Sequence, residues 1–379
     1  MNLQEFREEF PCVEHRSYLF AGAISPACKS VLNAATQILD EQRDDPLAVY
    51  DRGHELAGDL RAELRALING EVNRIALTEN ASRASALAIR LLDRRSPGGN
   101  IVVDSTAYPS SIYTWLTHGD HRIREVTTKP NESQGAAVGR ILGAVDEDTA
   151  AVVVSHVCPL TGYRHDIEGL GAALRTTSTA LFVDASQSVG AVEIDVRAAG
   201  VDVLVGTSMK WLLGTPGVGF LYVSPEFDDG TVMLDVGYAS VVDQGGLWPR
   251  SHVPPPVEGL QRLEVGMPAI VPIVAATAGI SLIRRVGVDV IERRVVELAH
   301  QVITCCVDAG LDPITPDASA SHAGVVAVRT PRAVEIASMG RRSGVDVGGY
   351  PWGLLRIDPH AYVVDADVRR LQEVFASVL

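Results

Sequence analysis

The sequence predicts an α/β fold, with a mainly parallel seven-stranded sheet in a large domain and a smaller C-terminal α/β domain. Three observations support this prediction. Between about residues 70 and 225, seven apolar, β-branched runs alternate with helical patterns. A Pro- and Gly-rich stretch around 240–260 then interrupts the alternation. Beyond it lie two long helical segments and a short strand–helix–strand–helix unit. Such alternation is typical of parallel sheets covered on both faces.

The seven predicted strands are short apolar runs at 74–78, 100–104, 122–128, 150–156, 180–186, 201–207 and 217–223. Helical patterns lie between them at 80–95, 138–145 and 166–177. After the break, helices are predicted at 270–286, 288–309, 332–343 and 365–379, with strands at 325–330 and 354–358. Ligands of such sheets collect at the carboxyl ends of the strands, so polar residues there are the first candidates for a site.

Composition excludes several classes of partner. The chain has 379 residues, 46% of them hydrophobic, and a net charge of −14 without basic clusters, so no nucleic-acid partner is expected. No stretch approaches the roughly 18 apolar residues of a membrane helix, so no membrane partner is expected either. The first residues carry four Glu and no apolar region, which argues against a signal peptide and for a cytoplasmic protein. The five cysteines form no CxxC pair, so neither disulfides nor a metal site is predicted.

Lysine usage singles out one residue. Only three of the 33 basic residues are lysines, and Lys29 and Lys129 lie in polar stretches next to prolines. Lys210 instead lies between an apolar strand and Trp-Leu-Leu-Gly. Burial there would disfavour its charged form by up to ~3–5 pKa units. A lysine with such a pKa is an amine nucleophile for a carbonyl, which is the chemistry of Schiff-base formation.

Other strand ends carry polar residues as well. Asp184 directly follows Leu-Phe-Val, Thr207 ends the run before Lys210, and a strand turns into a helix through Ala81 and Ser82. Taken singly, Asp184 and Ser82 are better explained as helix N-caps than as site residues. Together these residues supply an amine, a carboxylate for a ring nitrogen, and a helix N-terminus with hydroxyls for a phosphate. A phosphorylated pyridine aldehyde requires this set.

The segment FVDASQSVGAVEIDVRAAGVDVLVGTSMKWLLGTPGVGFLYV resembles the core signature of the class V aminotransferases, within the fold type I pyridoxal-5′-phosphate (PLP) enzymes. That family includes cysteine desulfurases, isopenicillin N epimerase-like proteins, kynureninases and carbon–sulfur lyases. The likeness runs from YLFAGAISP to LLRIDPHAYVVDADV. It implies a large PLP-binding domain over 21–259, a small domain over 260–379, and an N-terminal segment, 1–20, that packs with the small domain. It also implies a homodimer with the active site near the subunit interface.

The resemblance assigns roles around the cofactor ring. Lys210 would carry the cofactor as a Schiff base and move the α-proton, and Asp184 would pair with the pyridine nitrogen. Gln187 would hydrogen-bond the phenolic oxygen, and Tyr108 occupies the position whose ring stacks on the pyridine.

The remaining roles concern the phosphate and the substrate. Ala81 and Ser82 at the start of a helix, together with Thr207, would hold the phosphate. Arg356 matches the arginine that binds the α-carboxylate of the amino-acid substrate.

The sequence departs from the family pattern at several places. Tyr108 stands where His is common, Met209 and Pro159 replace a His and an Asn, and Met267 replaces a Thr that reaches the partner's phosphate. Desulfurases carry a catalytic Cys shortly before the arginine, but here the stretch SGVDVGGYPWGLLR contains none. Desulfurase chemistry is therefore not expected.

These features predict a PLP-dependent lyase acting on a small α-amino acid, with β-elimination from an S-substituted cysteine as the specific reaction. Specialised metabolism, such as antibiotic biosynthesis, is the expected setting. A class V aminotransferase, an epimerase or a decarboxylating deaminase would use the same residues, since the bond orientation at Cα selects the path. A non-catalytic PLP-fold protein remains a rival interpretation. So does a hydrolase using Ser110 or Ser111, although the chain lacks a Gly-x-Ser-x-Gly elbow there.

Overall fold

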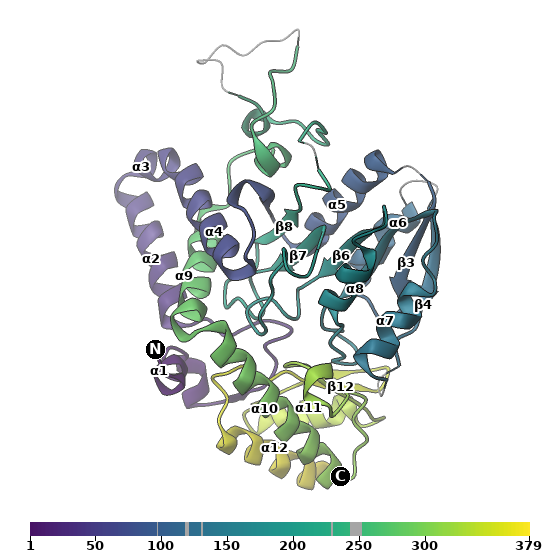
Figure 1. Cartoon of the computed structure of the whole chain (residues 1–379). Helices are drawn as coiled ribbons and strands as arrows, with labels where there is room; N and C mark the ends of the chain where they lie inside the picture. Colours follow the sequence, from purple (N-terminus) through teal and green to yellow (C-terminus); the bar gives the residue numbers. More distant parts are fainter. Residues whose placement is uncertain (97, 118–120, 130–131, 229, 243–251) are drawn as a thin grey trace.

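The central sheet has seven strands in the order β2-β8-β7-β6-β5-β3-β4, in a computed structural model that describes all residues except 97, 118–120, 130–131, 229 and 243–251 (Figure 1). The strands are β2 (Ile75–Thr78), β3 (Asn100–Asp104), β4 (Arg122–Val126), β5 (Thr149–Ser155), β6 (Ala180–Asp184), β7 (Val203–Thr207) and β8 (Gly219–Val223). Only β8 runs antiparallel to its neighbours. The predicted seven-stranded, mainly parallel sheet is confirmed.

Helices cover both faces of this sheet. On β5, Ala151 and Val153 face a cluster that includes residues of α5 (Ala81–Arg95) and α6 (Ser110–Thr117). Val152 and Val154 alternate with them and face a larger cluster on the other side. That cluster contains side chains of α4 (Gly53–Ile68), α7 (Gln134–Leu142), α8 (Ile167–Leu174), α9 (Ile270–Val286) and α10 (Val288–Asp308). The sheet is thus buried on both faces, which explains its near-continuous apolar strands.

The C-terminal part forms a smaller α/β unit, at the bottom of Figure 1. Its antiparallel sheet has the order β11 (Gly348–Tyr350), β12 (Leu354–Ile357), β9 (Val326–Arg329). Two helices, α11 (Ala333–Arg342) and α12 (Asp365–Val378), accompany these strands. Part of the predicted break before this unit, residues 243–251, lies outside the described residues.

The N-terminal segment lies against this C-terminal unit. After α1 (Leu3–Glu8), strand β1 (Ser17–Tyr18) pairs in parallel with β10 (Val345–Asp346). Arg7 forms an ion pair with Asp367 at 2.9 Å, and Arg16 forms one with Asp346 at 2.5 Å. These contacts join residues 1–20 to the C-terminal unit; the division of the chain at residues 20 and 259 stays a proposal.

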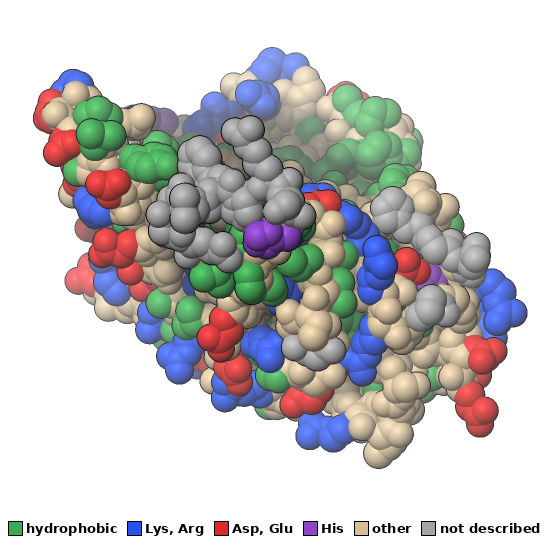
Figure 2. Space-filling view, turned by 90° about the horizontal axis from the view of Figure 1, so that it is seen from above, with side chains coloured by type: hydrophobic (Ala, Val, Ile, Leu, Met, Phe, Trp, Pro, Cys, Tyr) green, Lys and Arg blue, Asp and Glu red, His purple; other side chains and the backbone are tan. Residues whose placement is uncertain are grey.

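Helices α2 (Lys29–Asp44) and α3 (Pro46–Asp51) form a lobe that protrudes at the left of Figures 1 and 2. Its far end exposes Leu47 (72%) and Tyr50 (58%). Within the described residues, no single helix is both long and apolar enough to cross a membrane; α9 and α10 pass that test only as a pair bent by 84°.

Stacked aromatic rings join the N-terminal segment, the region of Lys210 and the C-terminal unit. The His360 ring lies 5.4 Å from Trp211, 5.2 Å from Tyr362 and 5.6 Å from Phe6 between centroids. His360 is fully buried. Burial disfavours the imidazolium and lowers the pKa of His360 to about 4.

This pKa predicts a pH-dependent stability. Between pH 6.5 and 4 the unfolded chain binds a proton at His360 that the folded chain does not, so the stability present above pH 6.5 is lost as pH falls. From pH 7 to pH 5 we expect His360 to remove about 2 kcal/mol of unfolding free energy. Urea unfolding at both pH values should show a smaller loss in His360→Phe than in the wild type. The exposed His54→Gln serves as control; an unchanged loss in His360→Phe would contradict the prediction.

Candidate active site

The carboxyl ends of the central strands converge on one small cavity. Residues from the ends of β5 and β6 and from the loops that follow β3, β5, β6 and β7 line it: Tyr108, Ser155, Val157, Pro159, Asp184, Ser186, Gln187 and Lys210. Parallel strands place their carboxyl ends at one edge, so residues far apart in the sequence meet here. Of the predicted site residues, Tyr108, Asp184, Gln187 and Lys210 are therefore brought together.

Lys210 lies within this cavity, with its Nζ 5.6 Å from the centre of the Tyr108 ring. Burial lowers the pKa of Lys210, and the nearby positive charge of Arg356 lowers it further. Asp184 and Asp358 act in the opposite direction. The net result is a pKa for Lys210 below its ordinary value, a shift toward the nucleophilic neutral amine and in the direction that the sequence predicted.

Asp184 ends β6 and is 5% exposed. Its Oδ1 accepts a hydrogen bond from the backbone N–H of Ser186 at 2.9 Å, and its Oδ2 accepts one from the hydroxyl of Ser111 at 3.1 Å. These bonds fix a carboxylate beside Lys210. Ser111 is fully buried, and within the described residues no histidine hydrogen-bonds Ser110 or Ser111. That arrangement speaks against the hydrolase interpretation.

The Gln187 side chain is held at both ends. Its Oε1 accepts from the indole N–H of Trp211 at 2.9 Å, and its Nε2 donates to the carbonyl of Gly22 at 2.9 Å. The amide orientation is thereby set, and Nε2 keeps a second N–H. A donor at this point suits an oxygen of a bound ring. The sequence did not reveal the role of Trp211, whose indole orients this amide.

The predicted phosphate residues lie at the start of α5 and the end of β7. Asn80 caps α5 by accepting from the N–H of Arg83 at 2.9 Å, and the hydroxyls of Ser82 and Ser110 are 2.7 Å apart. The first N–H groups of a helix have no intrahelical acceptor, and the helix dipole favours an anion there. The Thr207 hydroxyl, in contrast, donates to the Val218 carbonyl at 3.3 Å.

Gly219 allows α5 to begin directly against β8. A Cβ at Gly219 would lie 2.3 Å from the carbonyl carbon of Asn80 and 2.6 Å from the nitrogen of Ala81. The N-terminus of α5 can therefore lie this close to β8 only because residue 219 is glycine. The free N–H groups at this N-terminus and the Ser82 hydroxyl fit a phosphate.

We expect Gly219→Ala to weaken the binding of PLP by at least about tenfold, because the added methyl would push the α5 N-terminus off β8 and misplace its N–H groups. Titrating the cofactor-free protein with PLP measures this affinity. Gly58→Ala in α4 is the control, since nothing lies within 4 Å of its added methyl. Equal affinities in the two variants would contradict the prediction.

Arg356 on β12 reaches the same region but is already paired. It forms a buried ion pair with Asp358, and its guanidinium lies 5.4 Å from the Phe20 ring. Asp358 was not among the predicted site residues. Its place two residues after Arg356 in a strand, where alternate side chains share a face, was the available signal.

Three residues that differ from the family pattern, Pro159, Met267 and Tyr108, can be located in the structure. Pro159 lines the cavity, and Met267 packs on Gly53, whose added Cβ would lie 2.3 Å from the Met267 methyl. Tyr108 is 47% exposed, so one side of the site opens to the surface.

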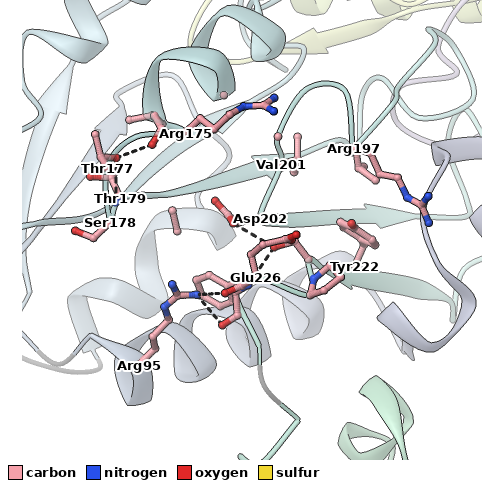
Figure 3. Close-up of a pocket in the computed structure, with 18 of the residues that line it drawn as sticks. Arg95, Arg175, Thr177, Ser178, Thr179, Arg197, Val201, Asp202, Tyr222 and Glu226 are labelled. Carbon is pink, nitrogen blue, oxygen red and sulfur yellow. Dashed lines mark hydrogen bonds between the residues drawn. The ribbon is translucent and has the colours of Figure 1, made fainter.

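A separate hollow of about 490 Å³ lies at the opposite edge of the sheet (Figure 3). Arg175, Arg197 and Tyr222 line it together with Asp202, which precedes β7 and bonds to Ser224 at 3.2 Å. The starts of β6 and β7 and the end of β8 border it, so it is distinct from the cavity of Lys210.

The fold and the cavity define a PLP-dependent enzyme: a lysine of lowered pKa, a fixed carboxylate and a helix N-terminus converge at the carboxyl ends of a parallel sheet. The family model described as "Aminotransferase class-V" matches residues 17–333. The chain belongs to the class V aminotransferase family. Its cofactor is pyridoxal 5′-phosphate, and it acts on amino acids.

Relatives and solved structures resemble the chain over most of its length. The uncharacterized aminotransferase YcbU of Bacillus subtilis is 24% identical, over 99% of this chain and 98% of the relative. Isopenicillin N epimerase of Streptomyces clavuligerus is 28% identical, over 84% and 83%. A structure of the cystine C–S lyase C-DES with its product cysteine persulfide superimposes with a TM-score of 0.88 at 20% identity, over 97% and 99%. These likenesses confirm the predicted fold type.

Proposed function

We propose that this enzyme is a carbon–sulfur β-lyase that acts on an S-substituted cysteine. The cysteines carry this proposal. Burial raises the pKa of all five thiols, Cys12, Cys28, Cys158, Cys305 and Cys306, and all but Cys12 are buried. None lies on the segment 343–356 that leads to Arg356. Cys158 lies between the cavity-lining residues Val157 and Pro159, but its thiol is buried and donates to the Thr106 carbonyl at 3.4 Å. With no exposed thiol beside Lys210 to accept sulfur, the sulfur would leave with its own substituent. The fold that the chain shares with a cystine C–S lyase also supports the proposal.

The reaction breaks the Cα–H and Cβ–S bonds of the substrate. With one water, an S-substituted cysteine gives pyruvate, ammonia and a thiol. When bound, PLP supplies an electron sink for the charge that develops at Cα. Ala81, Ser82 and Thr207 would hold its phosphate.

The chain's own side chains supply the remaining tasks. The neutral amine of Lys210 removes the Cα proton and returns a proton to the leaving sulfur. Asp184 holds a fixed negative charge against the ring nitrogen, and Gln187 donates to the ring oxygen. Tyr108 would cover the ring, while the free N–H groups of Arg356 bind the α-carboxylate.

Pyruvate release from S-substituted cysteines, without a keto-acid acceptor, tests the lyase directly. Sustained pyruvate and free thiol would support it. Conversion of the bound cofactor to its pyridoxamine form without release of pyruvate would contradict the lyase proposal and favour an aminotransferase. Inversion of the configuration at Cα would favour an epimerase, an alternative suggested by the 28% identity with isopenicillin N epimerase. Release of carbon dioxide would favour a decarboxylating deaminase. The similarity to isopenicillin N epimerase is also the reason to propose that this enzyme acts in specialised metabolism.

We also propose a homodimer with the active site near the interface. Tyr108 beside Lys210, and Tyr113 (63%) and Leu116 (63%) on the following helix α6, are exposed, and Figure 2 shows hydrophobic side chains gathered on the face seen from above. Exposed apolar side chains gathered on one face often mark an association site. Light scattering during size-exclusion chromatography should give twice the mass of 40.4 kDa; a monomer would contradict the proposal.

A further inference from the structure

Asp358 occupies one side of the Arg356 guanidinium. Nε of Arg356 donates to Oδ1 and Oδ2 of Asp358 at 3.2 and 3.1 Å, and Nη2 donates to Oδ2. Asp358 is fully buried, and Arg356 is 6% exposed. In the part of the chain that the structure describes, Nη1 donates to no protein acceptor. The pair therefore uses the Nε side of the guanidinium and leaves its end free.

The surrounding backbone fixes the pair in this position. The N–H of Asp358 donates to the Leu19 carbonyl at 2.7 Å, and its own carbonyl accepts from Ala21 at 3.1 Å. A Cβ at Gly22 would lie 2.4 Å from Oδ2 of Asp358 and 2.5 Å from Nη2 of Arg356. The backbone bonds therefore fix the position of Asp358, and its carboxylate and the Arg356 guanidinium both lie close to Gly22. Two N–H groups of Nη1 and one of Nη2 remain, and this fork fits one carboxylate in bidentate fashion.

The charges around Lys210 are balanced before a substrate arrives. Among the described residues, the charged groups that act on Lys210 are Asp184, Arg356 and Asp358. With Asp184 assigned to the cofactor ring, Arg356 and Asp358 remain, and their opposite charges shift the pKa of Lys210 in opposite directions. The α-carboxylate of a substrate would bring one more negative charge to the Arg356 guanidinium, which already pairs with Asp358. A second carboxylate on the same substrate would add a further negative charge to a site that already lies within the electrostatic reach of Asp358.

We propose that Asp358 is a specificity-determining residue that restricts the enzyme to amino acids with a single carboxylate, with a neutral or cationic substituent on sulfur. The inference rests on the proposed role of Arg356 as the site of the α-carboxylate. Asp358 itself does not react. It orients the free end of Arg356 and excludes substrates that carry a second acidic group.

Calorimetric titration of the PLP-loaded enzyme with unreactive carboxylates tests this without turnover. In the wild type, succinate should bind at least about tenfold more weakly than propionate, because a like-charge cost of about 1.4 kcal/mol corresponds to that ratio. Asp358→Asn removes the charge and should tighten both ligands, succinate more than propionate, so that the ratio approaches one. Asp358→Ser should act in the same direction with a smaller side chain.

Asp346→Asn is the matched control. Asp346 forms a comparable ion pair with Arg16 on strand β10 of the same unit, and it should leave both affinities unchanged. Thermal melting and the cofactor absorbance show whether each variant is folded and loaded. Should both Asp358 variants fail to fold, a wild-type ratio near one would still overturn the proposal.

Succinate binding as tightly as propionate in the wild type would overturn the proposal, and so would an unchanged ratio in folded Asp358 variants. Absence of binding by either ligand would overturn it too, since Arg356 must accept one carboxylate. The proposed lyase is tested separately by pyruvate release. A failed lyase with the expected carboxylate ratios would leave the role of Asp358 intact.

Discussion

Replacing Lys210 with alanine is expected to reduce Cα proton exchange by at least about 10³-fold, because the variant lacks the amine that removes the proton. Exchange of the Cα hydrogen of an amino acid for solvent deuterium is the suitable measurement. Elimination, transamination and epimerisation all require it, so the result does not depend on which reaction follows. Borohydride reduction followed by mass spectrometry should find the cofactor attached to Lys210 in the wild type and absent from the variant.

Lys129→Ala is the control for this experiment. Lys129 is exposed and lies in a polar stretch, so its loss should change neither exchange nor cofactor attachment. Substantial exchange by Lys210→Ala would show that another group removes the proton. Cofactor attached at Lys29 or Lys129 would place the site elsewhere.

Asp184→Asn should reduce the same exchange by roughly 10²–10³-fold while leaving the protein folded. The substitution keeps the shape of the side chain, and its Oδ1 can still accept from Ser186, but the negative charge disappears. A charge lost at about 4 Å from a cationic ring nitrogen costs roughly 4 kcal/mol at an effective dielectric of 20, enough for an effect of this size. Because Asp184 raises the pKa of Lys210, the variant's pKa for that lysine should also fall.

The matched control is Asp202→Asn at the opposite end of the same sheet. Asp202 lies outside the cavity of Lys210. Its carboxylate accepts from the Leu181 N–H at 2.9 Å and from the Ser224 hydroxyl at 3.2 Å. The substitution therefore removes a partly buried carboxylate without touching the site. Its exchange rate should equal that of the wild type. If Asp184→Asn also kept the wild-type rate, Asp184 would have a structural role only.

The central sheet was predictable because its strands are short, buried on both faces and therefore uniformly apolar. Polar residues that directly follow such runs, Asp184 and Lys210 among them, mark strand ends, and these predicted positions do meet in one cavity. Their roles toward the cofactor stay predictions.

Helices with weak apolar stripes escaped the sequence analysis. Helix α2 buries only Val31 and Ile38 along sixteen residues, and α6 is eight residues long and exposes Tyr113 and Leu116. Periodicity is faint in such segments, since too few positions face the core.

The partners of Arg356 were hidden for a different reason. Asp358 lies only two residues away, but its contact with Gly22 joins segments more than three hundred residues apart. A contact between segments so far apart in the sequence, such as that of Asp358 with Gly22, cannot be predicted from a local sequence pattern. The sequence assigned Arg356 to the α-carboxylate without naming a protein partner, whereas the structure shows Arg356 paired with Asp358 and with one end of its guanidinium free.

That long-range contact also bears on how the enzyme is made. Leu19 and Ala21 leave the ribosome early, yet their hydrogen-bond partner Asp358 is synthesised hundreds of residues later. The proposed α-carboxylate site at Arg356 can form only after nearly all of the chain has been translated, while the strands that lead to Asp184 and Lys210 are synthesised much earlier. A nascent chain would thus acquire its means of holding the cofactor before its means of choosing a substrate.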